Sequence, residues 1–166
     1  MNYVQLILSL AYRFGWDIRQ MDVKSAFLHG YLSKEIYIEQ PSSFRKKSNL
    51  VCVLKKSFYG LKQAPRAWYE KINQFFLTFG FKHSESNQSI YVLHHSGDTL
   101  IVALYVDDLV ITGNNVDLTF GLKKHLANTF EMTDLGLLHL FMANQVLQMR
   151  DGIFISQLKY VLDMLK

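Results

Sequence analysis

Apolar residues recur every three to four positions in three stretches of the chain, which is the spacing of one face of a helix. We therefore predict a helix that ends at Gly15, a second over residues 67–79 that ends at Gly80, and a third over residues 116–130. The positions that define the three faces are Leu6, Ile7, Leu10, Ala11 and Phe14, then Trp68, Ile72, Phe75, Phe76 and Phe79, then Leu118, Leu122, Leu126 and Phe130.

Shorter runs of β-branched and aromatic residues predict the strands. The first runs from about Trp16 to Val23, after which the segment Lys24–Gly30 leaves the sheet. Further strands are expected over residues 36–40 and 50–54, which form a short hairpin, and over 89–94, which forms an edge strand. Residues 99–106 and 109–113 are expected to form a central hairpin. Residues 137–148 and 153–155 are expected to form a last hairpin around Asp151-Gly152, before a closing helix over 157–166.

The principal elements follow the order strand, helix, strand, strand, helix, strand, with the last strand from about residue 138. This order predicts an α+β fold of the ferredoxin-like β-α-β-β-α-β type, with an antiparallel sheet and packed helices. A right-handed crossover joins the first two strands in parallel and leaves a gap that the third strand fills. Parallel strands end at the same edge of the sheet, so Asp22 is expected beside the turn between residues 106 and 109.

Two adjacent carboxylates, Asp107 and Asp108, interrupt the otherwise apolar run 100–112. They predict a tight turn between two strands, and an ordinary Asp-rich turn would give the same pattern. With Asp22 at the same edge, however, three carboxylates converge. Such a cluster can hold two divalent ions about 3.5–4 Å apart for phosphoryl transfer. Magnesium suits it, because this ion accepts a few carboxylates and completes its shell with water and substrate phosphates.

The composition indicates one folded domain that can bury a core, since 49% of the 166 residues are hydrophobic and only two are proline. The net charge of +4 suits an anionic partner such as nucleic acid without requiring one. The single cysteine, Cys52, excludes an internal disulfide, and the six histidines show no zinc spacing. The apolar opening resembles a signal peptide but lacks a basic start, so we interpret it as a core helix and expect no secretion.

Basic residues gather in two places. Residues 55–68 interleave four basic and three aromatic side chains, which suits a nucleic-acid groove, although a basic loop that enters a helix at Pro65 would look the same. Arg45, Lys46 and Lys47 form a second cluster, which is either a phosphate contact or a solvated loop.

Four motifs, at residues 20–30, 56–68, 105–108 and 130–136, closely resemble copia-type LTR-retrotransposon reverse transcriptases and stand in that family's order. The resemblance covers nearly the whole chain. It implies the palm of an RNA-directed DNA polymerase with part of the fingers. It also implies a single domain over residues 1–166 that is truncated at its N-terminus, with a partial fingers insertion over about residues 24–66.

The resemblance also implies a role for individual residues. Asp22, Asp107 and Asp108 match the catalytic carboxylates, which with the Val23 carbonyl would bind two Mg²⁺ or Mn²⁺ ions. Phe27 matches the steric gate that favours deoxynucleotides, although a packed core aromatic is the alternative. The remaining matches are Tyr59, Gly60 and Gln63 for the incoming nucleotide, Lys62, Pro65 and Arg66 for the template or primer, Tyr105 for the primer terminus, and Phe141, Met142 and Ala143 for the primer-grip hairpin.

The chain departs from the family pattern at several positions. Ala143 replaces a glycine where the backbone would meet the primer, and Gln145 replaces a glutamate. Asn87 and Ser43 replace a common aspartate and glycine. The resemblance also implies N-terminal fingers strands, a thumb, RNase H and integrase regions beyond these 166 residues, so we expect weak or no polymerase activity from this chain alone.

Three functions remain open at this stage. The first is a palm fragment in which a primer 3′-hydroxyl attacks the α-phosphate of a deoxynucleotide, with an RNA template, a DNA primer and further Pol segments as partners. Its expected location is cytoplasmic, in a virus-like particle, unless the gene is an unexpressed remnant. The second is a non-catalytic nucleic-acid-binding remnant that uses Lys55, Lys56, Lys62 and Arg66. The third is another two-metal enzyme such as a nucleotidyl cyclase, against which the 56–68 motif argues.

Overall fold

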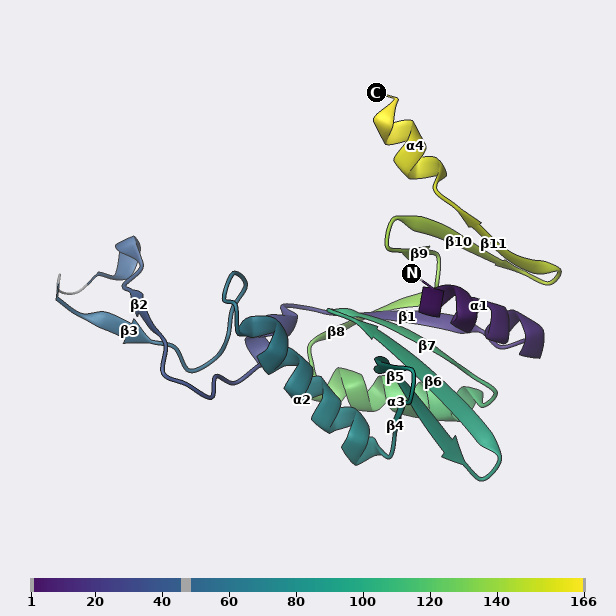
Figure 1. Cartoon of the computed structure of the whole chain (residues 1–166), viewed down its shortest axis with the longest axis horizontal. Coiled ribbons are helices and arrows are strands. Elements are labelled where there is room, and N and C mark those ends of the chain that lie inside the picture. Colours follow the sequence, from purple (N-terminus) through teal and green to yellow (C-terminus); the bar gives the residue numbers. More distant parts are fainter. Residues whose placement is uncertain (1, 46–48, 166) are drawn as a thin grey trace. The chain divides into compact units, whose positions relative to one another are not determined.

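The computed structural model describes residues 2–45 and 49–165, and the chain divides into two compact units. Unit 1 comprises Met1–Lys24 with Gly80–Lys166, and unit 2 comprises Ser25–Phe79. Figure 1 labels their elements. The described ranges contain four α-helices and three sheets in which every strand pair is antiparallel, so the fold is mixed α/β.

Unit 1 is built on a six-stranded sheet in the order β4-β5-β6-β7-β1-β8. The strand β7 lies between β1 and β6 and is antiparallel to both, so β1 and β6 run parallel to each other. The gap that the predicted topology leaves for the third strand is thus filled as expected. The strands are β1 (Ile18–Val23), β4 (Lys82–Ser84), β5 (Asn87–His95), β6 (Asp98–Tyr105), β7 (Asp108–Gly113) and β8 (Met132–Leu137).

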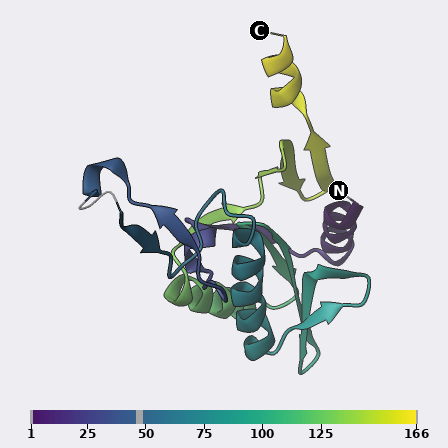
Figure 2. The ribbon, with the colours of Figure 1, turned by 60° about the vertical axis from the view of Figure 1, so that its left-hand side comes forward.

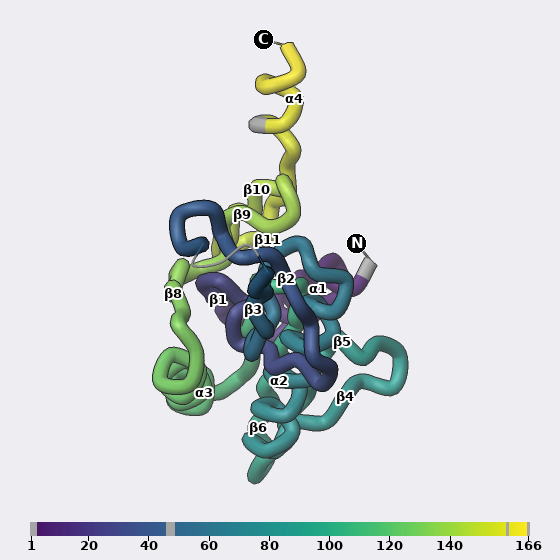
Figure 3. Tube along the Cα trace, turned by 90° about the vertical axis from the view of Figure 1, so that its left-hand side faces the viewer, coloured from purple at the N-terminus to yellow at the C-terminus, as the bar shows by residue number. Residues whose placement is uncertain are grey.

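Helices α1 (Asn2–Phe14) and α3 (Val116–Thr129) lie on either side of this sheet, as Figures 2 and 3 show. Helix α1 contacts β7, and its buried residues join Ile18 and Val110 in one hydrophobic cluster. Helix α3 contacts β7 and β8, and its Leu122 and Leu126 are fully buried. Its first turn is capped by the Asn115 side chain, which accepts a hydrogen bond from the Leu118 amide.

The first helix is confirmed, but its predicted face is partly wrong. It ends before Gly15, which has a φ of 67°. The buried residues are Ile7, Leu8 and Ala11, whereas Leu6 and Phe14 are each 55% exposed. The apolar face of α1 is broader than its contacts with the rest of the protein. Only the part that faces β7 and the C-terminal strand β11 (Gly152–Ser156) is covered.

The predicted fourth strand was placed too late in the chain. The strand that pairs with β1 is β8, which ends at Leu137, and the predicted strand over 137–148 is divided into β9 (Leu140–Phe141) and β10 (Asn144–Met149). The pairing of β8 shifts register between Gln20 and Met21, and Gly136 has a φ of 74° at this bulge. A bulged, half-polar edge strand lacks the regular alternation from which strands are predicted.

The strand over 89–94 was also predicted as an edge strand, and this is wrong. It corresponds to β5, which lies between β6 and the short strand β4. Beyond the main sheet, β9, β10 and β11 (Gly152–Ser156) form a three-stranded sheet, followed by α4 (Leu158–Met164). The turn at Asp151-Gly152 is confirmed.

A glutamine side chain connects the C-terminal sheet to the main sheet. Gln148 accepts a hydrogen bond from the Ile18 amide at 3.0 Å and donates to the carbonyl oxygens of Ile18 and Leu138, also at 3.0 Å. Both ends of the amide are therefore satisfied by backbone groups, which fixes the position of β10 against the start of β1.

Unit 2 contains the short helices η1 (Ala26–His29) and η2 (Ser42–Phe44), the hairpin of β2 (Tyr37–Glu39) and β3 (Val51–Val53), and α2 (Ala64–Phe79). The hairpin and the helix are confirmed, although α2 begins three residues earlier than predicted. Its Trp68, Ile72 and Phe76 are buried as expected, whereas Phe75 and Phe79 are only half-buried. Lys46 and Lys47 of the predicted basic cluster lie outside the described residues.

A close backbone approach holds η1 to α2. A Cβ on Gly30 would lie 2.8 Å from both the Ala67 Cβ and the Ser57 Oγ, so no larger residue fits there. The buried Ser57 hydroxyl donates to the Phe27 carbonyl oxygen beside it. None of the helices in the described ranges has the length and apolar character needed to cross a membrane.

Candidate active site

The three acidic residues singled out in the sequence meet at one edge of the main sheet. Asp22 near the end of β1 is paired directly with Asp108, the first residue of β7. The carbonyl oxygen of Asp107 accepts a hydrogen bond from the Val23 amide at 2.9 Å. The prediction that Asp22 lies at the same sheet edge as the 107–108 turn is therefore confirmed, and this follows directly from the pairing of β1 with β7.

Aromatic residues stand on the same face of the sheet. Tyr105 is paired with Asp108 across the β6–β7 turn, so both side chains point to one side. The Tyr105 ring packs edge-on against Phe141 of β9, with 6.0 Å between ring centroids. Two of the residues expected at the primer terminus and primer grip thus lie together, beside the carboxylates.

Two tight turns at this edge hold non-glycine residues in the left-handed backbone region. Val106, in the β6–β7 turn, has a φ of 55°, which is strained for a β-branched residue. Met142 and Ala143, between β9 and β10, have φ values of 48° and 64°. Two successive positive φ values are typical of a type I′ turn, which prefers Asn-Gly, so Ala143 occupies a position that favours glycine.

The carboxylates at this edge are short of positive charge. Loss of hydration and repulsion by Asp107 raise the pKa of Asp22, and Lys24 only partly opposes this. Desolvation also raises the pKa of Asp108; a hydrogen bond from Gln20 lowers it, while the charges of Asp107 and Asp22 raise it further. The ionised cluster is therefore unfavourable by itself, and a bound cation would stabilise it.

The nearest lysine is engaged with another acid. Lys24 Nζ lies 3.3 Å from Glu131 Oε1. Other ion pairs of the described residues include Arg19–Asp17, Arg45–Glu39, Arg66–Glu70 and Lys123–Asp134, and none of these four includes a carboxylate of the cluster. These ion pairs therefore do not neutralise the cluster, and Lys24 lowers the pKa of Asp22 only in part.

A divalent cation fits this edge in ligand chemistry. Carboxylate and carbonyl oxygens are the ligands that Mg²⁺ and Mn²⁺ prefer, and Asp22, Asp107, Asp108 and the Val23 backbone supply them. Within residues 2–45 and 49–165, however, no group of three or more His, Cys, Asp or Glu side chains lies close enough to hold an ion.

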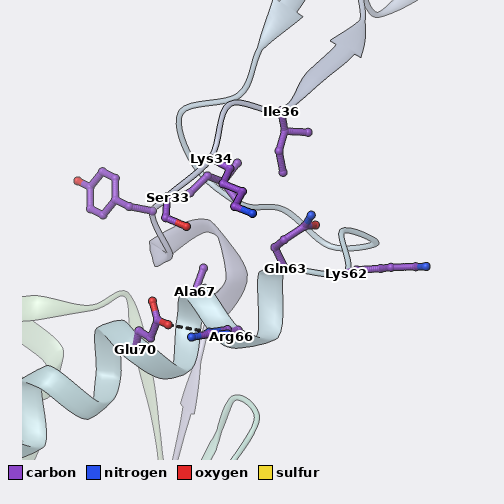
Figure 4. A pocket seen from close by; sticks show the side chains of 10 residues that line it. Ser33, Lys34, Ile36, Lys62, Gln63, Arg66, Ala67 and Glu70 are labelled. Carbon is purple, nitrogen blue, oxygen red and sulfur yellow. Dashed lines mark hydrogen bonds and ion pairs between the residues drawn. The ribbon is translucent and has the colours of Figure 1, made fainter.

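The residues expected to contact nucleotide and template, Phe27, Tyr59, Gly60, Lys62, Gln63, Pro65 and Arg66, all lie in unit 2. The rings of Phe27 and Tyr59 are in contact, with 5.7 Å between centroids, and Tyr59 is 84% exposed. Lys62, Gln63 and Arg66 line a cavity of about 640 Å³. Figure 4 shows Lys34 on one side of this cavity and Gln63 and Arg66 at the start of α2 on the other.

Gln20 was not predicted as a site residue. This residue is only 4% exposed, and its Nε2 donates a hydrogen bond to Asp108 Oδ1 at 2.9 Å. A signal was present, because a polar residue two positions before Asp22 must share its face of the strand.

A sequence profile of the family described as reverse transcriptase (RNA-dependent DNA polymerase) matches residues 1–166. The chain belongs to the reverse transcriptase family. By this membership it is related to RNA-directed DNA polymerases, and the resemblance to copia-type enzymes seen in the sequence is confirmed.

Among similar reverse transcriptase chains are the retrovirus-related Pol polyproteins from transposon RE1 of Arabidopsis thaliana and from transposon TNT 1-94 of Nicotiana tabacum. The first is 39% identical over 164 residues, covering 98% of this chain and 11% of the relative. The second is 40% identical over 166 residues, covering 97% of this chain and 12% of the relative. The chain thus spans about a tenth of the length of these relatives. No solved structure matches it.

Removal of one charge from the cluster should stabilise the fold at neutral pH. The pKa of Asp108 is raised in the folded state, so the protonated carboxyl contributes to the free energy of unfolding. This contribution is present in full below the ordinary carboxyl pKa of 3.8 and is lost as the pH rises through the raised pKa. Asp108→Asn should therefore raise the free energy of unfolding at pH 7 by up to about 1 kcal/mol, and by less at pH 5. Urea unfolding at both pH values measures this. Asp151→Asn, in an exposed turn, is the control, and an equal gain there would contradict the account.

Glycine in place of Ala143, in the turn between β9 and β10, should make the chain more stable. Ala143→Gly removes a left-handed alanine, which should stabilise the chain by about 0.5–1 kcal/mol after the entropy of glycine is deducted. Ala127→Gly, in the exposed interior of α3, should destabilise by a similar amount. Thermal unfolding of both variants tests this, and a loss of stability in Ala143→Gly would show that the turn is not strained.

Proposed function

We propose that this chain is the palm, with part of the fingers, of an RNA-directed DNA polymerase that transfers a deoxynucleotide to a primer 3′-hydroxyl with the help of two Mg²⁺ or Mn²⁺ ions. The observation that carries the proposal is the pairing of Asp22 with Asp108 at a turn that also holds Asp107. Membership of the reverse transcriptase family supports the reaction class.

The strand order supports a ferredoxin-like palm. Four adjacent strands, β8-β1-β7-β6, have the neighbours and directions that this arrangement requires, and α3 connects β7 with β8. In this proposal β5 and β4 extend the sheet at one side, and the C-terminal sheet contributes the primer grip. Unit 2, with bounds of 25–79, would contain both the fingers portion expected over 24–66 and α2, the first helix of the palm.

The proposed chemistry assigns the carboxylates to the metal and the aromatic residues to the primer. Bound divalent ions would supply positive charge to the attacking hydroxyl and to the leaving pyrophosphate. Asp22 and Asp108 would hold them from adjacent strands, with Asp107 and the Val23 carbonyl as further ligands. Tyr105 and Phe141 pack on the same face, so a primer end seated on them would lie beside the carboxylates.

The distribution of charge supports contacts between unit 2 and nucleic acid. Unit 2 contains nine lysine and arginine residues and three acidic residues, a net charge of +6, whereas the rest of the chain has nine basic and eleven acidic residues, a net charge of −2. A polyanion would therefore be attracted to unit 2. Tyr31 beside the cavity is 64% exposed, with Lys56 Nζ 5.8 Å and Lys71 Nζ 5.9 Å from its ring centroid. Such a ring can stack on a base while the lysines contact phosphate.

The same distribution favours a second candidate function, a non-catalytic nucleic-acid-binding remnant of the retroelement. Its basis is that the cationic side chains of unit 2 do not need the carboxylates of unit 1 in order to contact phosphate groups. The two candidates differ in whether binding leads to templated incorporation.

The partners of the whole protein are likewise proposals, because the chain spans about a tenth of its Pol relatives. They are an RNA template, a DNA primer, deoxynucleoside triphosphates and the remaining Pol segments, in a cytoplasmic particle of the retroelement.

Metal binding tests the carboxylate site directly. We expect the chain to bind Mn²⁺ or Mg²⁺ and Asp107→Asn to weaken this binding sharply, because one anionic ligand is lost. Isothermal calorimetry measures the affinity, and Asp117→Asn, in the first turn of α3, is the control. Equal affinity in the Asp107 variant and the unaltered chain would remove the site.

Nucleic-acid binding tests unit 2. We expect a primer–template duplex to bind with an affinity that falls with salt, and Lys62→Gln to reduce the slope of this dependence by about one ion. Lys82→Gln, at an exposed position at the start of β4, is the matched control. Binding is measured by fluorescence anisotropy with and without a chelator. Primer extension by the same complex supports the polymerase, binding without extension supports the remnant, and salt-independent binding contradicts both.

A further inference from the structure

Gln20 is the most buried polar residue next to the carboxylate edge. It lies in the middle of β1, paired with Val110 of β7 on one side and with Gly136 of the edge strand β8 on the other. Its Nε2 donates to Asp108 Oδ1 at 2.9 Å. Its Oε1 is buried and has no hydrogen-bond partner among the described residues.

The orientation of this amide is set by chemistry. An ionised carboxylate can only accept hydrogen bonds, so Gln20 must present its NH₂ group to Asp108. The amide oxygen then points away from Asp108, into a place where it is unsatisfied. An apolar side chain beside Ile18 and Val110 would avoid burying that oxygen. The packing of the sheet therefore does not explain a glutamine at this position.

The contact with Asp108 does explain it. Strand pairing with Asp22 and Tyr105 fixes the backbone of Asp108 but leaves the rotation of its carboxylate free. A hydrogen bond at Oδ1 fixes that rotation and leaves Oδ2 as the open oxygen. Partners of this kind commonly orient metal-binding carboxylates.

The neighbouring strand β8 is bulged beside Gln20. The register of the β1–β8 pairing shifts immediately after Gln20, and such bulges re-aim side chains next to active sites. The bulge is held by Asp134, whose Oδ1 accepts from the Gly136 amide at 3.0 Å and which pairs with Lys123. The motif at residues 130–136, which no step of the proposed reaction uses, thus shapes the strand beside Gln20.

We propose that Gln20 is a positioning residue, which holds the Asp108 carboxylate so that its second oxygen is presented to a divalent cation. This inference rests on the proposed function, since it assumes that the carboxylate edge binds metal. It predicts that the loss of Gln20 weakens metal binding without weakening the fold.

The test compares two glutamine variants of the full chain, with Mn²⁺ alone as the probe. The electron paramagnetic resonance signal of free Mn²⁺ gives the affinity, and thermal unfolding without metal gives the stability. Gln20→Met should weaken Mn²⁺ binding roughly 10-fold, in the range typical for such supporting partners, with an unchanged or higher Tm. Gln148→Met removes the backbone contacts of a structural glutamine, so it should lower Tm and leave the affinity unchanged.

A third variant shows whether Gln20 acts through Asp108. In an Asp108→Asn background, Gln20→Met should cause no further loss of Mn²⁺ affinity. A full additional loss there, an unchanged affinity in Gln20→Met alone, or failure of Gln20→Met to fold would each overturn the positioning role. Failure of the proposed function is a separate result, namely that the unaltered chain binds no Mn²⁺, and the positioning role falls with it.

Discussion

The antiparallel pairing of β1 with β7 is the constraint on which the rest of the structure depends. It places Asp22 opposite Asp108, although these residues are far apart in the sequence, and it brings Asp107 within one backbone hydrogen bond of Val23. A shift of one residue in this register would send Asp22 to the opposite face of the sheet. The apolar residues of β1 and β7 prevent such a shift, because they are already committed to the core on their own faces.

The same pairing lowers the stability of the fold at this edge of the sheet. Two partly desolvated carboxylates face each other beside a third, and the cations nearby are paired with other acids. Gln20 and Val106 add a buried unsatisfied oxygen and a strained backbone in the same place. Features that weaken a fold and gather at one edge are typical of a functional site. The positive charge of the chain is concentrated elsewhere, in unit 2, where a phosphate backbone would be attracted.

The carboxylate edge could be predicted from sequence because it follows from topology. Once the order of elements is known, Asp22 and the 107–108 doublet must share an edge, whatever the details of packing. Strand β8 could not be predicted, since its bulge at Gly136 and its exposed positions remove the alternation. The buried side of α1 was also misjudged, as both Leu6 and Leu8 are apolar and only the neighbouring sheet decides between them. The contact of Gln20 with Asp108 depends on register across 88 residues, which periodicity does not give.

The most direct test of the account is a map of where a divalent ion binds on the folded chain. In ¹H–¹⁵N correlation spectra, a substoichiometric amount of Mn²⁺ broadens the amide signals of residues close to the ion. The account predicts that the signals of Val23, Asp107 and Asp108 broaden first, together with those of Asp22 and Tyr105. Broadening that spares these five residues, or that centres on another acidic surface of unit 1, would contradict it.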